Sequence, residues 1–303
     1  MKTIKLMLCL FGFALLFAIA AANAADAPKL TFNFTKANVP GEFQTLVAEI
    51  NNNGVMVGEY QDAKGYFHGY ILDGKKLTRL NHPKGKNTGL SGINFNGPIK
   101  VVGSYTNSNG NSVGFRYMPA TKKFTDIPSP KGATSSYTGG MNDQGWIAGY
   151  YTDSSNNVHG FLLQGTKYTI LDVPGATATY AYGINNKGDI TLTWVNSSGA
   201  YEGALYNYNA KSYTTIKVPG AGATGSEASF INNQGDITFW WFDSSGTVHG
   251  ALFVHAMNKF YKFDYPKAVG GTYPNGINDE NALVGQYQHF VNGPVSSFKA
   301  TFK

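Results

Sequence analysis

The 303-residue chain contains a single cysteine, Cys9, and that cysteine lies within the first 24 positions. If those positions are removed during export, neither a disulfide, a thiolate ligand nor a cysteine nucleophile can contribute. The fold must then depend on its hydrophobic core. A chain of about 280 residues can supply one, because a domain of this size buries roughly 75% of its unfolded surface.

Arginine is also scarce, since Arg79 and Arg116 are the only two. The lysines are scattered and form no basic run. Removing Lys2 and Lys5 from the 24 basic residues leaves 22 against 18 acidic ones, a net charge of +4. This pattern is typical of solvated strand edges, so we expect no nucleic-acid partner.

Long apolar runs are missing after residue 24. Before it, Lys2 and Lys5 flank the start of the apolar stretch LMLCLFGFALLFAIA, and Ala22-Asn23-Ala24 forms an A-x-A cleavage pattern. These features predict a signal peptide over residues 1–24. No later stretch approaches the ~20 apolar residues of a membrane-spanning helix. We therefore predict a secreted or periplasmic protein, monomeric and without a membrane span after cleavage.

Helical spacing of apolar residues is missing as well, and a repeat takes its place. The pattern [IM]-N-x-x-G recurs, with Asn281 in place of the glycine in the last repeat, and its asparagines lie 43 to 48 residues apart. This period, with turn-forming and strand-forming residues in abundance, is typical of four-stranded propeller blades. The six repeat asparagines are Asn51, Asn94, Asn142, Asn185, Asn232 and Asn278.

The repeat that contains Asn185 can be divided into four strands, which we call a to d. They begin at Thr179, at Asp189, at Ala200 and at Ser212, and short turns join them. The last repeat has no strand d, whereas Leu30 to Phe34 resembles one. The sequence predicts an all-β domain over residues 25–303: a six-bladed β-propeller of four-stranded antiparallel blades, closed by the N-terminal strand.

Strand b shows a regular pattern of core residues. Nine residues after the repeat asparagine (eleven in the second repeat) stand only aromatic residues: Tyr60, Tyr105, Tyr151, Trp194, Trp241 and Tyr287. Two positions earlier stand Gly58, Gly103, Gly149, Leu192, Phe239 and Gly285. Period-2 spacing puts both sets on one buried face. The glycines are expected to allow neighbouring blades to approach closely.

The pattern GINNxGxIxGxYxDSxGxxHGF…YTxLDVPGA is strongest from Gly140 to Gly175 and covers nearly the whole chain after residue 24. It resembles the HAF-type extracellular repeats of bacterial exported proteins, although His-Gly-Phe or His-Gly-Ala stands where that family often has His-Ala-Phe. The resemblance implies a secreted or envelope-associated propeller-like protein. It carries no settled activity.

Two sets of polar residues could suggest metal sites. Asp62, Asp153 and Asp243 begin DSSG-like turns, but Asn107 and Asn196 replace the carboxylate in two repeats, which favours structural turns over calcium loops. His68, His159 and His249 recur in alternate blades on strand c, too far apart for one zinc ion. We predict no metal, no cofactor and a local structural role for each histidine.

The start of strand a is the better candidate for a site, because it lines the axis of a propeller. Five residues before each asparagine stand Leu46, Gly89, Tyr137, Tyr180, Glu227 and Tyr273. Three before stand Ala48, Ser91, Gly139, Tyr182, Ser229 and Asn275. These columns predict an axial funnel of hydroxyl, amide and aromatic groups that suits a carbohydrate; packing of the tyrosines against loops is the alternative.

Trp240 extends this hypothesis. It alternates with the core residue Trp241, so it lies on the opposite face of strand b. We expect it to form a stacking surface with Tyr180 and Tyr182, or else to pack between blades. The predicted function is a ligand-binding or surface-interaction module, possible ligands being a glycan or another envelope polymer. A polysaccharide hydrolase or lyase using Glu227 is one alternative, and a purely structural envelope or matrix protein is another; catalytic residues are unknown.

Overall fold

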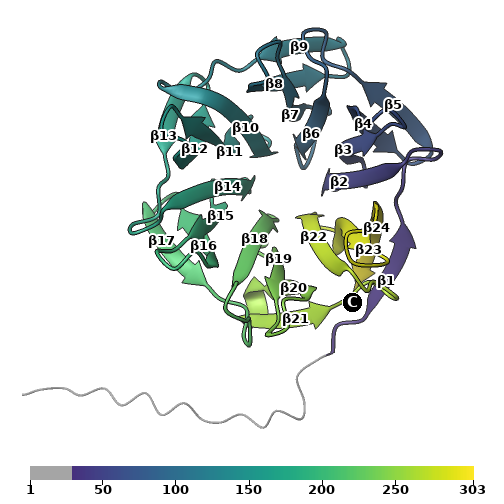
Figure 1. The fold of residues 1–303 in the computed structure, drawn as a ribbon, viewed down its shortest axis with the longest axis vertical. Coiled ribbons are helices and arrows are strands. Elements are labelled where there is room, and N and C mark those ends of the chain that lie inside the picture. Colours follow the sequence, from purple (N-terminus) through teal and green to yellow (C-terminus); the bar gives the residue numbers. More distant parts are fainter. Residues whose placement is uncertain (1–28) are drawn as a thin grey trace, which may run out of the picture. The chain divides into compact units, whose positions relative to one another are not determined.

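The computed structural model describes residues 29–303, so the predicted signal peptide lies outside the described residues. Residues Thr31–Lys303 form one compact unit. Six four-stranded antiparallel sheets follow one another around a ring, and strand a of each lies innermost (Figure 1). The predicted six-bladed propeller is confirmed.

Blades 1 to 5 use strands in chain order from the axis outward, and in blade 6 the N-terminal strand β1 is outermost. Blades 1 to 3 consist of β2 (Gln44–Ile50), β3 (Met56–Gln61), β4 (Phe67–Asp73) and β5 (Lys76–Leu80); β6 (Thr88–Ile93), β7 (Val101–Thr106), β8 (Ser112–Met118) and β9 (Lys123–Asp126); and β10 (Ala133–Met141), β11 (Ile147–Asp153), β12 (Val158–Gln164) and β13 (Lys167–Ile170). Blades 4 to 6 consist of β14 (Ala178–Ile184), β15 (Ile190–Val195), β16 (Tyr201–Asn207) and β17 (Ser212–Ile216); β18 (Ser226–Ile231), β19 (Ile237–Phe242), β20 (Val248–Val254) and β21 (Lys259–Phe263); and β22 (Gly271–Ile277), β23 (Ala282–Gln288), β24 (Val295–Phe302) and β1 (Phe32–Lys36).

The N-terminal strand closes the ring, as predicted, although β1 lies two residues later than Leu30 to Phe34. It pairs antiparallel with β24, from Phe32 opposite Phe302 to Lys36 opposite Phe298. The ring of Phe32 also lies 4.4 Å from that of Phe263 in blade 5. The strand therefore covers the edge of β24 and packs against a neighbouring blade.

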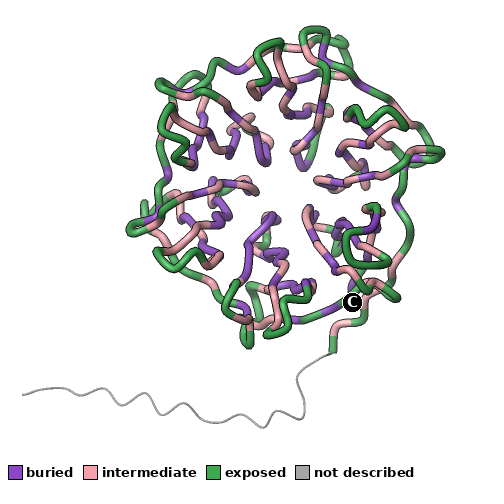
Figure 2. Tube along the Cα trace, viewed as in Figure 1, coloured by how far each residue is buried: buried purple, intermediate pink, exposed green. Residues whose placement is uncertain are grey.

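The core lies within and between the blades, and Figure 2 shows buried segments along the inner strands with exposed turns around the outside. Five of the six aromatic residues of strand b are at most 8% exposed, and Trp194 is half-buried. The only helical element between residues 29 and 303 is one 3₁₀ turn, His255–Met257, and no helix there is long and apolar enough to cross a membrane.

The glycines of strand b have a different role from the one predicted. A Cβ added at Gly58 or Gly149 would clash with a backbone carbonyl of strand a in the same blade, not with a neighbouring blade. Cross-strand pairs explain the exceptions: glycine faces Val47, Leu90, Thr138 or Pro274, whereas Leu192 and Phe239 face Ala181 and Ala228. A large side chain on one strand is thus matched by a small one opposite.

Every innermost strand contains a β-bulge just before its repeat asparagine. The register shifts lie between Val47 and Glu49 in β2 and at the equivalent place in the other five blades. The bulges leave unpaired Ala48, Ser91, Gly139, Tyr182, Ser229 and Asn275, the column three residues before the asparagine. Because a bulge re-aims side chains, it turns this column toward the axis.

The repeat asparagines join the blades at the rim formed by the a-to-b turns. All six are at most 2% exposed. Each side-chain oxygen accepts a backbone N–H of its own turn, and the side-chain amides of four donate to the carbonyl of the equivalent asparagine in the next blade: Asn142 to Asn185 (3.1 Å), Asn185 to Asn232 (3.4 Å), Asn232 to Asn278 (3.1 Å) and Asn278 to Asn51 (2.9 Å). We call these six residues the asparagine ring.

The asparagine ring is interrupted where the repeat is irregular. The a-to-b turn of blade 2 is two residues longer, and Asn94 donates to Pro98 O of its own turn at 3.1 Å. The neighbouring Asn96 instead reaches the next blade, because its N–H donates to Asp143 Oδ1 at 2.9 Å. A longer turn therefore keeps a link between blades through another residue.

Candidate binding site

Three adjoining cavities surround the ring axis. The first has a volume of about 470 Å³, the second about 280 Å³ and the third about 250 Å³. Asn275 lines all three, and Tyr150 lines the first two. We call them together the axial cavity; their volumes are in the range of small-ligand sites.

The second of these cavities contains all six residues of the bulge column: Ala48, Ser91, Gly139, Tyr182, Ser229 and Asn275. Of the column five residues before the asparagine, Leu46, Gly89, Tyr137, Glu227 and Tyr273 line one or more of the three cavities. Tyr180 lines none of them. The predicted residues are therefore brought together at the axis, except Tyr180, which is half-buried outside the lining.

Strand b supplies wall residues that the sequence-based prediction did not include. Each residue five before the asparagine pairs across the sheet with a residue of strand b, as Leu46 does with Glu59, Tyr137 with Tyr150 and Tyr273 with Gln286. Glu59, Tyr150 and Gln286 all line the axial cavity. They stand one position before the aromatic core column, which is the signal that could have identified them.

This strand-b column alternates around the ring. In even blades it bonds the next blade's innermost strand: Ser104 Oγ accepts Thr138 N–H (3.2 Å), Thr193 Oγ1 donates to Ala228 O (3.2 Å) and Gln286 Nε2 donates to Val47 O (2.6 Å). In odd blades the column holds Glu59, Tyr150 and Trp240. These three groups form no such bond among the described residues, and all three line the axial cavity.

Aromatic rings form two groups in the wall. Tyr150 stacks on Tyr137 at 4.9 Å between centroids and meets the edges of Tyr180 at 5.1 Å and Tyr182 at 6.0 Å. Trp240 belongs to the second group, because its ring contacts are with Phe242 at 5.7 Å and Tyr273 at 5.5 Å. The predicted grouping of Trp240 with Tyr180 and Tyr182 is thus only partly seen: it shares the second cavity with Tyr182.

Two carboxyl groups of this wall have no hydrogen-bond or ion-pair partner within residues 29–303. Burial raises the pKa of Glu227 to about 8 and that of Glu59 to about 7. Glu227 is 6% exposed. Both differ from Glu49, which is also buried but whose Oε2 accepts the Ile93 N–H at 2.7 Å. Glu227 and Glu59 can therefore donate a proton to a ligand when neutral or attract a cation when ionised.

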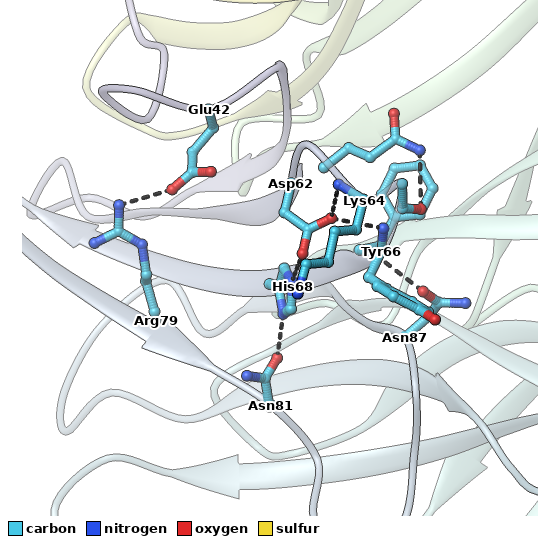
Figure 3. A network of polar contacts seen from close by, with 11 residues as sticks. Glu42, Asp62, Lys64, Tyr66, His68, Arg79, Asn81 and Asn87 are labelled. Carbon is cyan, nitrogen blue, oxygen red and sulfur yellow. Dashed lines mark hydrogen bonds and ion pairs between the residues drawn. The ribbon is translucent and has the colours of Figure 1, made fainter.

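The histidines of strand c line none of the three cavities and are held by local bonds, which Figure 3 shows for His68. His68 Nδ1 lies 2.6 Å from Asn81 Oδ1, and its Nε2 lies 3.1 Å from Asp62 Oδ2. His249 bridges Asp264 (2.8 Å) and Asp243 (3.3 Å) in the same way. Each histidine thus links the b-to-c turn to the exit of strand d, and the prediction of a local structural role is confirmed.

The turns that contain these aspartates are built by the side chain itself. Asp62 Oδ1 accepts the N–H groups of Lys64 (2.8 Å) and Tyr66 (2.9 Å), and Asp153, Asp243, Asn107 and Asn196 do the same in their turns. In blade 4 the turn asparagine also donates to Glu202 Oε1 (3.0 Å). The turn prediction is confirmed, and asparagine serves as well as aspartate.

No family model matches the chain, and no curated protein matches it in sequence. The HAF-type resemblance therefore stays a prediction. Solved structures are similar in fold: TolB from Acinetobacter baumannii (10% identity, TM-score 0.56, 88% of this chain and 67% of that one) and AofleA from Arthrobotrys oligospora (14%, 0.54, 89% and 82%). A fucose-specific lectin from Aleuria aurantia is a looser likeness (14%, 0.47, 72% and 76%). At these identities the likeness shows the propeller fold alone.

Proposed function

We propose that this protein is an exported binding module that takes a carbohydrate-type ligand in the axial cavity. The observation that carries this proposal is the composition of the wall: tyrosine and tryptophan faces alternate with serine, threonine, asparagine and glutamine groups. Aromatic faces pack against the apolar face of a sugar ring, and the amides and hydroxyls orient its hydroxyl groups.

Variation around the ring also supports a ligand site. A purely structural axis would repeat one residue at each position, as the asparagine ring does. The wall instead presents Leu46, Gly89, Tyr137, Glu227 and Tyr273 at equivalent positions of five blades. The signal peptide and the HAF-type resemblance, both predictions from sequence, favour a ligand outside the cytoplasm.

A glycan-array screen of the mature protein, followed by titration of Trp240→Ala, tests the proposal. We expect the variant to lose about 1–2 kcal/mol of binding free energy, the scale of an aromatic contact, at an unchanged melting temperature. Tyr66→Ala is the matched control, because Tyr66 is 45% exposed and lines none of the three cavities. Unchanged affinity in Trp240→Ala together with a large loss of stability would return Trp240 to a packing role.

A polysaccharide hydrolase or lyase is a second candidate, favoured by the raised pKa values of Glu227 (about 8) and Glu59 (about 7). A carboxyl group that stays neutral near pH 7 can act as a general acid. Release of new reducing ends from a bound glycan, abolished by Glu227→Gln while glycan binding persists, would favour the enzyme. A structural envelope protein predicts no saturable ligand at all.

A further inference from the structure

Glu227 is the more deeply buried of the two acidic side chains of the wall. Three other glutamates of the propeller are paired: Glu42 with Arg79 (2.8 Å), Glu202 with Lys217 (2.9 Å) and Glu49 with the Ile93 N–H (2.7 Å). Within residues 29–303, Glu227 has no hydrogen bond or ion pair, although it is 6% exposed and lines the axial cavity. A buried carboxylate without a partner is costly, so a group from outside the chain would stabilise it.

The surroundings of Glu227 favour a cation as that group. Tyr150, Tyr182 and Trp240 line the same cavity, and the faces of aromatic rings attract cations. None of the residues that line the three cavities is lysine, arginine or histidine. Glu59 adds a second carboxyl group in the adjoining cavity. The whole chain has a net positive charge, yet the only carboxyl or basic side chains that line the three cavities are those of Glu227 and Glu59.

We propose that the axial cavity takes a ligand with an ammonium group, which lies against the Glu227 carboxylate and the rings of Tyr150, Tyr182 and Trp240. This rests on the proposed function, because it specifies the ligand of the same cavity. An amino sugar has the required chemistry: its hydroxyl groups suit the polar wall and its ammonium group suits Glu227. Anionic sugars are disfavoured, because no basic side chain is present in the wall to receive them.

Affinity for such a ligand depends on the ionisation of Glu227. Burial raises the pKa values of Tyr150, Tyr180 and Tyr182 around it, so these tyrosines stay neutral, and Glu59 lines the adjoining cavity. Burial raises the pKa of Glu227 to about 8, so at pH 6 a cation must first displace its proton. Affinity for a ligand of fixed charge should therefore rise with pH up to about 8 and then level off.

Choline and its uncharged isostere 3,3-dimethyl-1-butanol test the inference, titrated by calorimetry or NMR at pH 6, 7, 8 and 9. At pH 8 we expect choline to bind at least about tenfold more tightly than 3,3-dimethyl-1-butanol does. The affinity for choline should fall roughly tenfold for each pH unit below 8. Glu227→Gln should abolish both the preference and its pH dependence. Glu49→Gln should retain both, because Glu49 is buried but lines none of the three cavities.

Equal affinity for the two isosteres, no binding of either, or a preference that survives in Glu227→Gln would overturn the inference. Tetramers of glucosamine and of N-acetylglucosamine separate this failure from failure of the proposed function. If both tetramers bind in the axial cavity equally well and choline shows no preference, the sugar-binding function stands and the ammonium site is wrong. If choline is preferred and no saccharide binds, the ammonium site stands and the sugar-binding function is wrong.

Discussion

The asparagine ring and the wall of the axial cavity are built on the same six strands, yet they follow opposite rules. In the asparagine ring, one residue type recurs in every blade and is at most 2% exposed. A few residues earlier on the same strands, the side chain varies from blade to blade, and among residues 29–303 two carboxyl groups of the wall have no hydrogen-bond or ion-pair partner. Positions of the asparagine ring are repeated, whereas positions that line the cavity vary.

Removal of the closing strand β1 should reduce the stability of the propeller most. Deleting residues 26–41 exposes the edge of β24, so we expect aggregation or a melting temperature lower by more than about 10 °C. Deleting residues 26–30 alone keeps β1 and should leave thermal unfolding unchanged. A protein without residues 26–41 that melts like the parent would refute closure by β1.

A substitution within the asparagine ring should be the next most damaging. Asn232 donates to Asn278 O (3.1 Å) and accepts the Asp236 N–H (2.9 Å). Asn232→Ala leaves both backbone groups buried without partners, at a cost of about 2–4 kcal/mol in the free energy of unfolding. Chemical denaturation measures it, with the exposed Asn109→Ala as a control that should change stability by less than about 0.5 kcal/mol. Equal effects of the two substitutions would mean that the asparagine ring stabilises the fold no more than an exposed residue does.

A substitution in the cavity wall should instead increase the stability of the protein. Glu227 has an ordinary pKa of 4.5, and burial raises it to about 8 in the fold. The folded protein therefore holds a proton that the unfolded chain has lost, and its stability should fall as pH rises from about 4.5 to about 8. Glu227→Gln should be more stable than the parent at pH 8, on the order of 2 kcal/mol, with a flatter pH profile. A less stable variant would mean that Glu227 stabilises the fold.

Substitution of a histidine that links the b-to-c turn to the exit of strand d should change stability least. Burial lowers the pKa of His249, but its contacts with Asp264 and Asp243 outweigh this, and the net pKa is raised above 6.5. Its contribution is complete below pH 6.5 and is lost as pH rises through the folded-state pKa. His249→Gln should cost less than about 1 kcal/mol at pH 6 and almost nothing at pH 9, because the group is partly exposed. Denaturation at the two pH values measures the difference.

The sequence was sufficient to predict the blades and their closure, because the residues that form the blades recur in each repeat. Asparagine spacing, the aromatic core column and the missing last strand led to six blades and their closure. The cavity was predicted only in part, since Tyr137, Glu227 and Tyr273 were included and Glu59, Tyr150 and Gln286 were not. The β-bulge in each innermost strand explains the omission: it shifts the register by one residue and so changes which strand-b residues share the cavity face. No residue type in the repeat marks that bulge.

A crystal structure with a ligand taken from the glycan screen tests most directly the claim that the variable wall is the binding site. We expect ligand density in the axial cavity, against Tyr150, Tyr182, Glu227 and Trp240. A different cavity of about 490 Å³ lies between blades 4 and 5, beside Tyr201, Glu202 and Lys217. Density there, with an empty axial cavity, would contradict the account.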